Sequence, residues 1–265
     1  DGVQALRQPG STLKPFLYQL ALEQKQIRPN TILADVPSAY AIPGAQLYRP
    51  VDYHEQFQGP VRVRIALANS LNVPAVKLLE TIGVPNFLTY LRQLGFVHLT
   101  HPPEYYGLGL TLGSGEVTLW ELARAYLTLS RQGNPLDLAV LPSGLKNSPT
   151  PPSLLKPNAA SWSLMTDILS DRFARAQAFG VDSLLSLPFP SAVKTGTSSD
   201  FRDTWTVGYT VDYTVATWVG NFDGAAMQNV SGVTGAAPLW NRIMLHLHEH
   251  HEPKAFLTPP GLVKR

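Results

Sequence analysis

A serine and a lysine near the start of the chain are spaced so that they could act as a nucleophile and its base. Ser11 and Lys14 lie three positions apart, and at this spacing two side chains share one face of a helix. A serine hydroxyl is a weak nucleophile and needs an adjacent proton acceptor. The Lys14 amine can fill that role only if burial and a neighbouring cation lower its pKa from about 10.4. The pair therefore predicts acyl transfer through serine.

The Ser-x-x-Lys spacing occurs four times in the chain, so the spacing alone has little weight. Taken alone, the first pair is better explained as a capping serine and a solvated lysine. In the occurrence at Ser191 and Lys194, the alternating faces of a predicted strand would separate the two side chains. The remaining two lie in a turn-rich connection, at Ser143 and Lys146 and at Ser153 and Lys156. Only Ser11 has a helical context that suits the chemistry.

A second polar pair supports a catalytic interpretation. Ser70 and Asn72 form the only Ser-x-Asn sequence in the chain and precede a predicted helix. A hydroxyl and an amide at these positions could relay a proton toward a leaving amine. They could also hold Lys14 or the backbone of a bound peptide in place.

The only Lys-Thr-Gly sequence in the chain begins at Lys194, within a predicted strand. The Lys194 ammonium group and the hydroxyls of Thr195 and Thr197 would bind a carboxylate. Gly196 would let the strand backbone approach a bound peptide, which could pair along it as an added strand. The backbone N–H groups of Ser11 and Thr197 are candidate donors to an oxyanion.

Hydrophobic periodicity predicts the elements that must position these residues. Helices are expected from near Ser11, over 61–82, 85–94, 118–132 and 159–171, and from Ala237. Residues 28–60 have little periodicity and are expected to form a long loop, and residues 141–157 an exposed connection. Beyond Pro190, three β-branched, alternating runs predict antiparallel strands, with a tight turn at Asp212 and Tyr213.

Composition excludes several classes of protein and site. The chain has 265 residues, of which 44% are hydrophobic, enough for a sizeable core. Its net charge of +2, without a basic stripe, argues against nucleic acid as a partner. The absence of cysteine excludes disulfides and thiolate metal sites. No run approaches the roughly 18 apolar residues of a membrane helix. The sequence opens without an initiator methionine, so we expect a fragment that contacts a membrane only through an upstream anchor absent from this chain.

The three motifs occur in the order Ser-x-x-Lys, Ser-x-Asn and Lys-Thr-Gly, a set typical of penicillin-binding proteins and class A β-lactamases. Nearly the whole chain resembles the transpeptidase domain of class A penicillin-binding proteins and is most similar to their C-type branch. The matching stretches are 7–22, 66–80, 106–126, 192–210, 216–224 and 236–244.

This resemblance implies an α+β fold of the β-lactamase/transpeptidase type. An antiparallel sheet covered by helices would lie beside a mostly helical subdomain, with the site in the cleft between them. The helical part would span roughly 20–160, and the sheet part roughly 1–19 and 161–265. In similar proteins, residues upstream of the serine add strands to the sheet, so the sheet is expected to lack these strands here.

The resemblance also implies a serine acyltransferase that attacks the D-Ala-D-Ala end of peptidoglycan stem peptides and is inhibited by β-lactam antibiotics. It would act on the periplasmic face of a bacterial inner membrane and needs no cofactor or metal. Asp203 and Trp205 also match the family, and we interpret them as pocket architecture rather than catalysts. By the same matching, the catalytic residues would be Ser11, Lys14, Ser70 and Asn72, and the substrate-binding residues Lys194, Thr195, Gly196 and Thr197.

Two alternatives use the same cleft. A β-lactamase or D,D-carboxypeptidase would pass the acyl group to water, but no segment resembles the Glu-x-x-Leu-Asn sequence that offers a deacylating glutamate. Transpeptidation is therefore favoured over hydrolysis. A non-catalytic receptor for β-lactams or cell-wall peptides could keep all three motifs, and a purely structural module would not be acylated at all.

Overall fold

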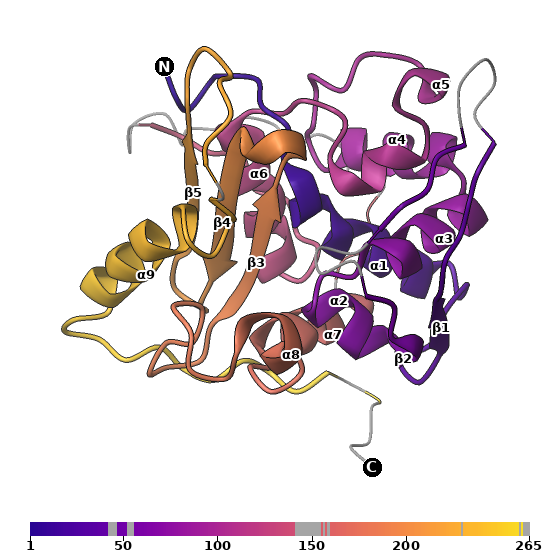
Figure 1. Ribbon diagram of the computed structural model, residues 1–265. Coiled ribbons are helices and arrows are strands. Elements are labelled where there is room, and N and C mark those ends of the chain that lie inside the picture. Colours follow the sequence, from indigo (N-terminus) through magenta and orange to yellow (C-terminus); the bar gives the residue numbers. More distant parts are fainter. Residues whose placement is uncertain are drawn as a thin grey trace.

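A small antiparallel sheet and a group of helices lie side by side in the computed structural model (Figure 1). The structure describes residues 1–41, 47–51, 56–140, 155, 157, 160–228, 230–259 and 261. The predicted connection 141–157, with two of the four Ser-x-x-Lys pairs, therefore lies almost wholly outside the described residues. None of the described helices is long and apolar enough to cross a membrane.

The sheet has the three strands predicted from the sequence. They are β3 (Ala192–Thr197), β4 (Asp203–Tyr209) and β5 (Thr214–Gly220), in the order β3-β4-β5 with both pairs antiparallel. The predicted turn between β4 and β5 is confirmed by the hydrogen bond from Thr210 N to Tyr213 O (2.9 Å). A short 3₁₀ turn, η4 (Ser199–Phe201), joins β3 to β4.

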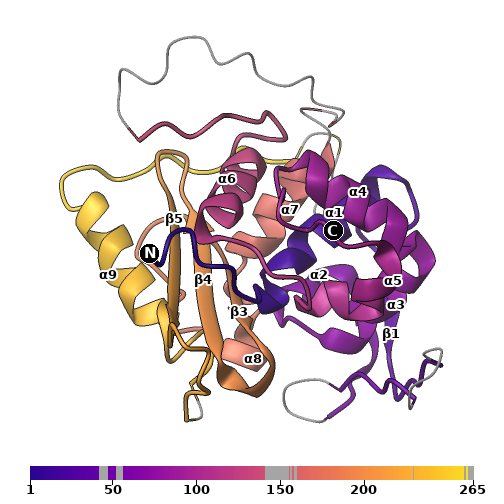
Figure 2. The ribbon, with the colours of Figure 1, turned by 90° about the horizontal axis from the view of Figure 1, so that it is seen from above.

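Helices cover both faces of the sheet, as Figure 2 shows. On one face lies α9 (Ala236–Leu247), whose Trp240 and Met244 form a small core with Val193 and Val215. On the other face lie α6 (Leu119–Ser130) and α7 (Ala160–Ser170), beside the main core. All seven residues of β4 are buried, because both faces of this central strand are covered.

The helical part surrounds α1 (Lys14–Glu23), which follows the 3₁₀ turn η1 (Gly10–Leu13). Phe16 on α1 makes edge contacts with Phe96 and Tyr126 inside the main core. The remaining elements of this part are α2 (Val63–Ala68), α3 (Asn72–Ile82), α4 (Val84–Gln93), α5 (Pro103–Tyr106) and η2 (Gly107–Leu112). A further short helix, α8 (Ala176–Phe179), precedes the sheet.

Three of the predicted elements differ from the structure. The run 61–82 is two helices, α2 and α3, because Ser70 between them has a left-handed backbone (φ +60°) that interrupts the helix. The expected loop 28–60 begins and ends with paired strands, β1 (Ile32–Asp35) and β2 (Gly59–Arg62), each too short to show a period. Ser11 lies in the η1 turn rather than in a regular α-helix.

Candidate active site

The turn that carries Ser11 is held between β3 and the residue that follows η2. Gly10 has a left-handed backbone (φ +57°), and a Cβ at this position would lie 2.5 Å from Thr197 O. A Cβ on Gly113 would lie 2.2 Å from Gly10 N. The absence of both side chains therefore lets three backbone segments meet, and it fixes Ser11 close to the Lys-Thr-Gly strand.

The second motif lies in the break between α2 and α3. Ser70 N donates to Leu67 O (3.0 Å) and Leu71 N to Ala66 O (2.9 Å), which closes the turn onto α2. Asn69 is buried and ties this turn to the α8 region, since its Nδ2 donates to Ala174 O (2.7 Å). The positive φ of Ser70 therefore sets the direction of its side chain, and the hydrogen bond of Asn69 holds the turn in place.

Lys14 connects the first motif to the second. Its side chain is fully buried at the start of α1. Its Nζ donates to the backbone oxygen of Ser70 and to Oδ1 of Asn72, both at 2.6 Å, and lies 3.4 Å from Ser70 Oγ. A lysine amine, a hydroxyl and an amide from separate parts of the chain therefore form one polar cluster.

Lys194 brings the third motif into the same cluster. Its Nζ donates to Ser70 Oγ (2.7 Å) and to Thr195 O (3.0 Å). Burial lowers the pKa of Lys194 well below its usual value, and the positive charge of Lys14 lowers it further. Two lysines thus flank a single hydroxyl.

The cluster lies at a cavity of about 1060 Å³. Of the predicted site residues, six line this cavity: Ser11, Ser70, Asn72, Thr195, Gly196 and Thr197. Lys14 and Lys194 are both buried and are joined to the lining residues by the hydrogen bonds given above. The structure therefore brings all eight predicted residues to one place. Among the described residues that line the cavity, none carries a carboxylate.

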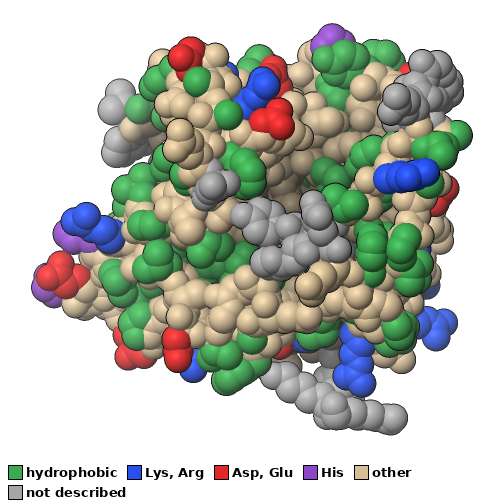
Figure 3. Space-filling model, in the orientation of Figure 1, with side chains coloured by type: hydrophobic (Ala, Val, Ile, Leu, Met, Phe, Trp, Pro, Cys, Tyr) green, Lys and Arg blue, Asp and Glu red, His purple; other side chains and the backbone are tan. Residues whose placement is uncertain are grey.

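Other residues of the cavity were not singled out from the sequence. Phe57 and Phe179 come from segments without periodic pattern and contribute aromatic surface to the lining. Gly232 N donates to Thr197 Oγ1 (3.0 Å), so a segment beyond β5 closes against the third motif. Figure 3, in the orientation of Figure 1, shows that the described side chains at the centre of this view are mostly uncharged. Asn69 also lines the cavity. In the sequence, its position directly before Ser70 was the one indication that it belongs to the site.

Comparison with known proteins identifies the family. The family model for the penicillin-binding protein transpeptidase domain matches residues 2–245. The chain belongs to this family. The resemblance predicted from the motifs is therefore confirmed, and so is the α+β fold that it implied.

Relatives of this transpeptidase domain include class A penicillin-binding proteins. Penicillin-binding protein 1C of Escherichia coli is 35% identical over 243 residues, which cover 92% of this chain and 30% of that protein. Penicillin-binding protein 1A of Neisseria meningitidis is 30% identical over 282 residues, covering 98% of this chain and 34% of that protein. The chain thus spans about a third of the length of the curated relatives it matches.

Solved structures share the fold of this transpeptidase domain. The PonA1 protein of Mycobacterium tuberculosis, in complex with penicillin V, superposes with a TM-score of 0.80 at 21% identity, over 99% of this chain and 74% of that one. Penicillin-binding protein 1A of Haemophilus influenzae gives a TM-score of 0.76 at 24% identity, over 100% of this chain and 46% of that one.

Proposed function

We propose that this domain is a serine D,D-transpeptidase that cross-links peptidoglycan stem peptides and is acylated by β-lactams at Ser11. The observation that carries the proposal is the shared Ser70 hydroxyl, which contacts Lys14 from the first motif and Lys194 from the third. Through this hydroxyl, the buried Lys14 and the buried Lys194 are joined to the cavity that Ser11 and Ser70 line.

In the proposed reaction, Lys14 first loses its own proton, and Ser11 Oγ then attacks the carbonyl carbon of the penultimate D-alanine and gives its proton to the Lys14 amine. The backbone N–H groups of Ser11 and Thr197 stabilise the negative charge on the carbonyl oxygen. The C–N bond then breaks, and the terminal D-alanine leaves as an amine after it receives a proton through Ser70. An acceptor amine attacks the resulting ester, forms a new amide and restores the Ser11 hydroxyl.

The third motif is proposed to hold the terminal carboxylate of the donor peptide. Lys194 supplies positive charge, and Thr195 and Thr197 supply hydroxyls beside it on β3. Gly196 lies in the same strand, and a Cβ at this position would lie 2.3 Å from Pro9 O. The close packing of β3 on the Ser11 turn therefore depends on this glycine. The donor is proposed to lie along β3.

A hydrolytic function would need a group that activates water beside the acyl-enzyme. The cavity lining, as far as the structure describes it, offers no carboxylate for this task, and this supports transfer to an amine over transfer to water. Since the proposed substrate lies outside the cytoplasmic membrane, the domain is proposed to act on the extracytoplasmic side of a bacterial inner membrane.

The test is exposure of the purified chain to benzylpenicillin, followed by intact-mass analysis and sequencing of the modified peptide. We expect one stable adduct on Ser11, absent in Ser11→Ala and retained in Ser231→Ala, whose hydroxyl also lines the cavity. An adduct on another residue would contradict the proposal. Rapid loss of the label would favour a β-lactamase or carboxypeptidase.

Transfer itself is measured with a donor peptide that ends in D-Ala-D-Ala and an acceptor amine. The cross-linked product and free D-alanine should appear together and disappear in Ser11→Ala. A labelled chain that forms no product from any donor would instead identify a receptor.

A further inference from the structure

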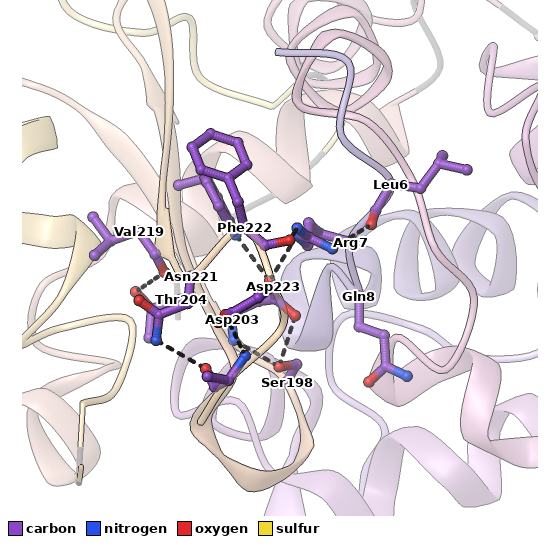
Figure 4. A network of polar contacts seen from close by, with 12 residues as sticks. Leu6, Arg7, Gln8, Ser198, Asp203, Thr204, Val219, Asn221, Phe222 and Asp223 are labelled. Carbon is purple, nitrogen blue, oxygen red and sulfur yellow. Dashed lines mark hydrogen bonds and ion pairs between the residues drawn. The ribbon is translucent and has the colours of Figure 1, made fainter. Parts of the chain in front are cut away.

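A network of polar contacts links the segment before Ser11 to strands β4 and β5 and to the turn after β5 (Figure 4). Arg7 is its centre: Nε lies 3.8 Å from Asp203 Oδ1, and Nη2 donates to Phe222 O. The guanidinium also lies over the ring of Trp218, 5.6 Å from its centroid. Arg7 therefore contacts β4, β5 and the turn after β5 at once.

Asp203 carries this network to the end of β3. Its carboxylate is almost fully buried, with Oδ1 accepting from Trp218 Nε1 (3.0 Å) and Oδ2 from Ser198 Oγ (3.1 Å). Two backbone contacts reinforce the second link, from Asp203 N to Ser198 Oγ (2.8 Å) and from Ser198 N to Asp203 O (2.9 Å). Ser198 directly follows Thr197, so Asp203 fixes the strand end that carries the third motif.

The segment before Ser11 has few ways to move relative to this strand end. Arg7 exchanges two backbone hydrogen bonds with Val117, at 3.0 and 2.9 Å. Gln8 O accepts from Trp205 Nε1 (2.8 Å), which joins the next residue to β4. The side chain of Arg7 is thus the charged part of a clamp that begins four residues before Ser11.

We propose that Arg7 and Asp203 are positioning residues that set the separation between the Ser11 turn and the end of β3. This inference rests on the proposed function, because the N–H groups of Ser11 and Thr197 are the proposed oxyanion donors and come from these two segments. Neither Arg7 nor Asp203 is among the residues that line the cavity. They act through Ser198 and through the backbone of residues 8–10, without touching substrate.

The charge pair suits this task because its two members lie in different segments and have little access to water. The side chains are 20% and 7% exposed. Removal of one partner would leave the other charge poorly solvated, and the two segments would shift to hydrate it. Oxyanion stabilisation is sensitive to such shifts, since displacement of reacting groups by about 1 Å can lower a rate by about 100-fold.

The experiment compares Arg7→Met, Asp203→Asn and the double variant with the unmodified chain. Acylation by a fluorescent penicillin is followed at several concentrations, which separates the limiting acylation rate constant from the apparent affinity. We expect each single variant to lower the limiting rate constant by about 10-fold or more, with a smaller change in affinity. The double variant should be no slower than the slower single variant, because both substitutions break one link. Arg7→Lys, which keeps the charge, should restore part of the rate.

Arg202→Met is the matched control. Arg202 lies in the loop between β3 and β4, is 57% exposed and pairs with Asp200 at 3.6 Å. Its loss removes a positive charge near the same strand end without touching the Arg7 network, so acylation should be unchanged.

Trp218→Phe keeps a ring below Arg7 but removes the indole donor to Asp203. It should give a smaller loss of rate, and it tests the inference if the charge variants fail to fold.

Unchanged limiting rate constants in folded Arg7→Met and Asp203→Asn would overturn the inference. So would a loss of rate that follows only the folded fraction measured by thermal melting. In either case the unmodified chain would still form the Ser11 adduct, so the proposed function would stand. Failure of the unmodified chain to form any adduct would instead reject the proposed function first.

Discussion

Lys194 and Ser70, 124 positions apart in the chain, are joined by a hydrogen bond of 2.7 Å from Nζ to Oγ. Lys14 Nζ lies 3.4 Å from the same oxygen. A hydroxyl that accepts from two lysines directs its own hydrogen elsewhere, because its lone pairs are occupied. This one oxygen connects the predicted base, Lys14, to the predicted carboxylate-binding residue, Lys194.

The first prediction concerns the pH dependence of acylation. Burial and the charge of Lys14 lower the pKa of Lys194, so its ammonium form disappears at a lower pH than that of a free lysine. If that ammonium binds the carboxylate, the second-order acylation rate constant should fall on the alkaline side well below pH 10.5. Lys194→Arg keeps its charge over this range, so its alkaline fall should move to higher pH, with a lower maximum. Identical alkaline limbs would rule out this role.

The same shift affects stability. Between the lowered pKa of folded Lys194 and the ordinary value, the unfolded chain binds more protons than the folded chain. The contribution of this group to the free energy of unfolding therefore rises with pH across that window. Urea unfolding at several pH values should show this rise in the unmodified chain and lose it in Lys194→Met.

A second prediction separates stability from activity at Ser70. Its backbone φ of +60° is unfavourable for any residue with a Cβ. Ser70→Gly should therefore be more stable than Ser70→Ala by about 1 kcal/mol. Both variants lack the hydroxyl between the lysines and should acylate about 100-fold more slowly or worse. Thermal melting and benzylpenicillin kinetics on the two variants test this, and equal melting temperatures would contradict it.

A third prediction concerns the close backbone contact beneath Ser11. Gly113 has a φ of +84°, and a Cβ there would lie 2.2 Å from Gly10 N, so Gly113→Ala adds backbone strain and a clash. We expect a loss of about 3 kcal/mol or more in the free energy of unfolding, together with slower acylation.

Gly224→Ala is the matched control for this prediction. Gly224 follows β5 and has a φ of +75°, but no atom lies within 4 Å of the added Cβ. Its substitution should lose only about 1–2 kcal/mol from backbone strain. Chemical unfolding distinguishes the two variants, and equal losses would mean that the contact with Gly10 has no energetic weight.

A fourth prediction concerns Asn69, which anchors the second motif. Its Nδ2 donates to Ile65 O (3.0 Å) and Ala174 O (2.7 Å), and its Oδ1 accepts from Ala178 N (2.9 Å). Asn69→Ala leaves these groups without partners in a buried site, so we expect a loss of about 1–3 kcal/mol. The exposed Asn86 makes a hydrogen bond to Ile82 O, and Asn86→Ala should change stability by less than about 0.5 kcal/mol. Urea unfolding of both variants provides the comparison.

Much of the fold was predictable because its signals are local. The β-branched alternation after Pro190 predicts β3, β4 and β5, and the apolar spacing predicts α4, α6, α7 and α9. The break at Ser70 and the pair of strands β1 and β2 were missed. A left-handed serine has no signature in the sequence, and strands of four residues depend on pairing with a distant segment.

The sequence by itself determined which chemical groups are available: a hydroxyl and an amine at helical spacing, a Ser-x-Asn turn, and a cationic strand in a fixed order. Only the tertiary structure decided that the two lysines meet at one hydroxyl, and that Arg7 and Asp203 join the Ser11 turn to the end of β3. The physical reason is that these contacts span long stretches of chain. Their distances depend on how backbones without side chains, as at Gly10 and Gly113, pack against each other.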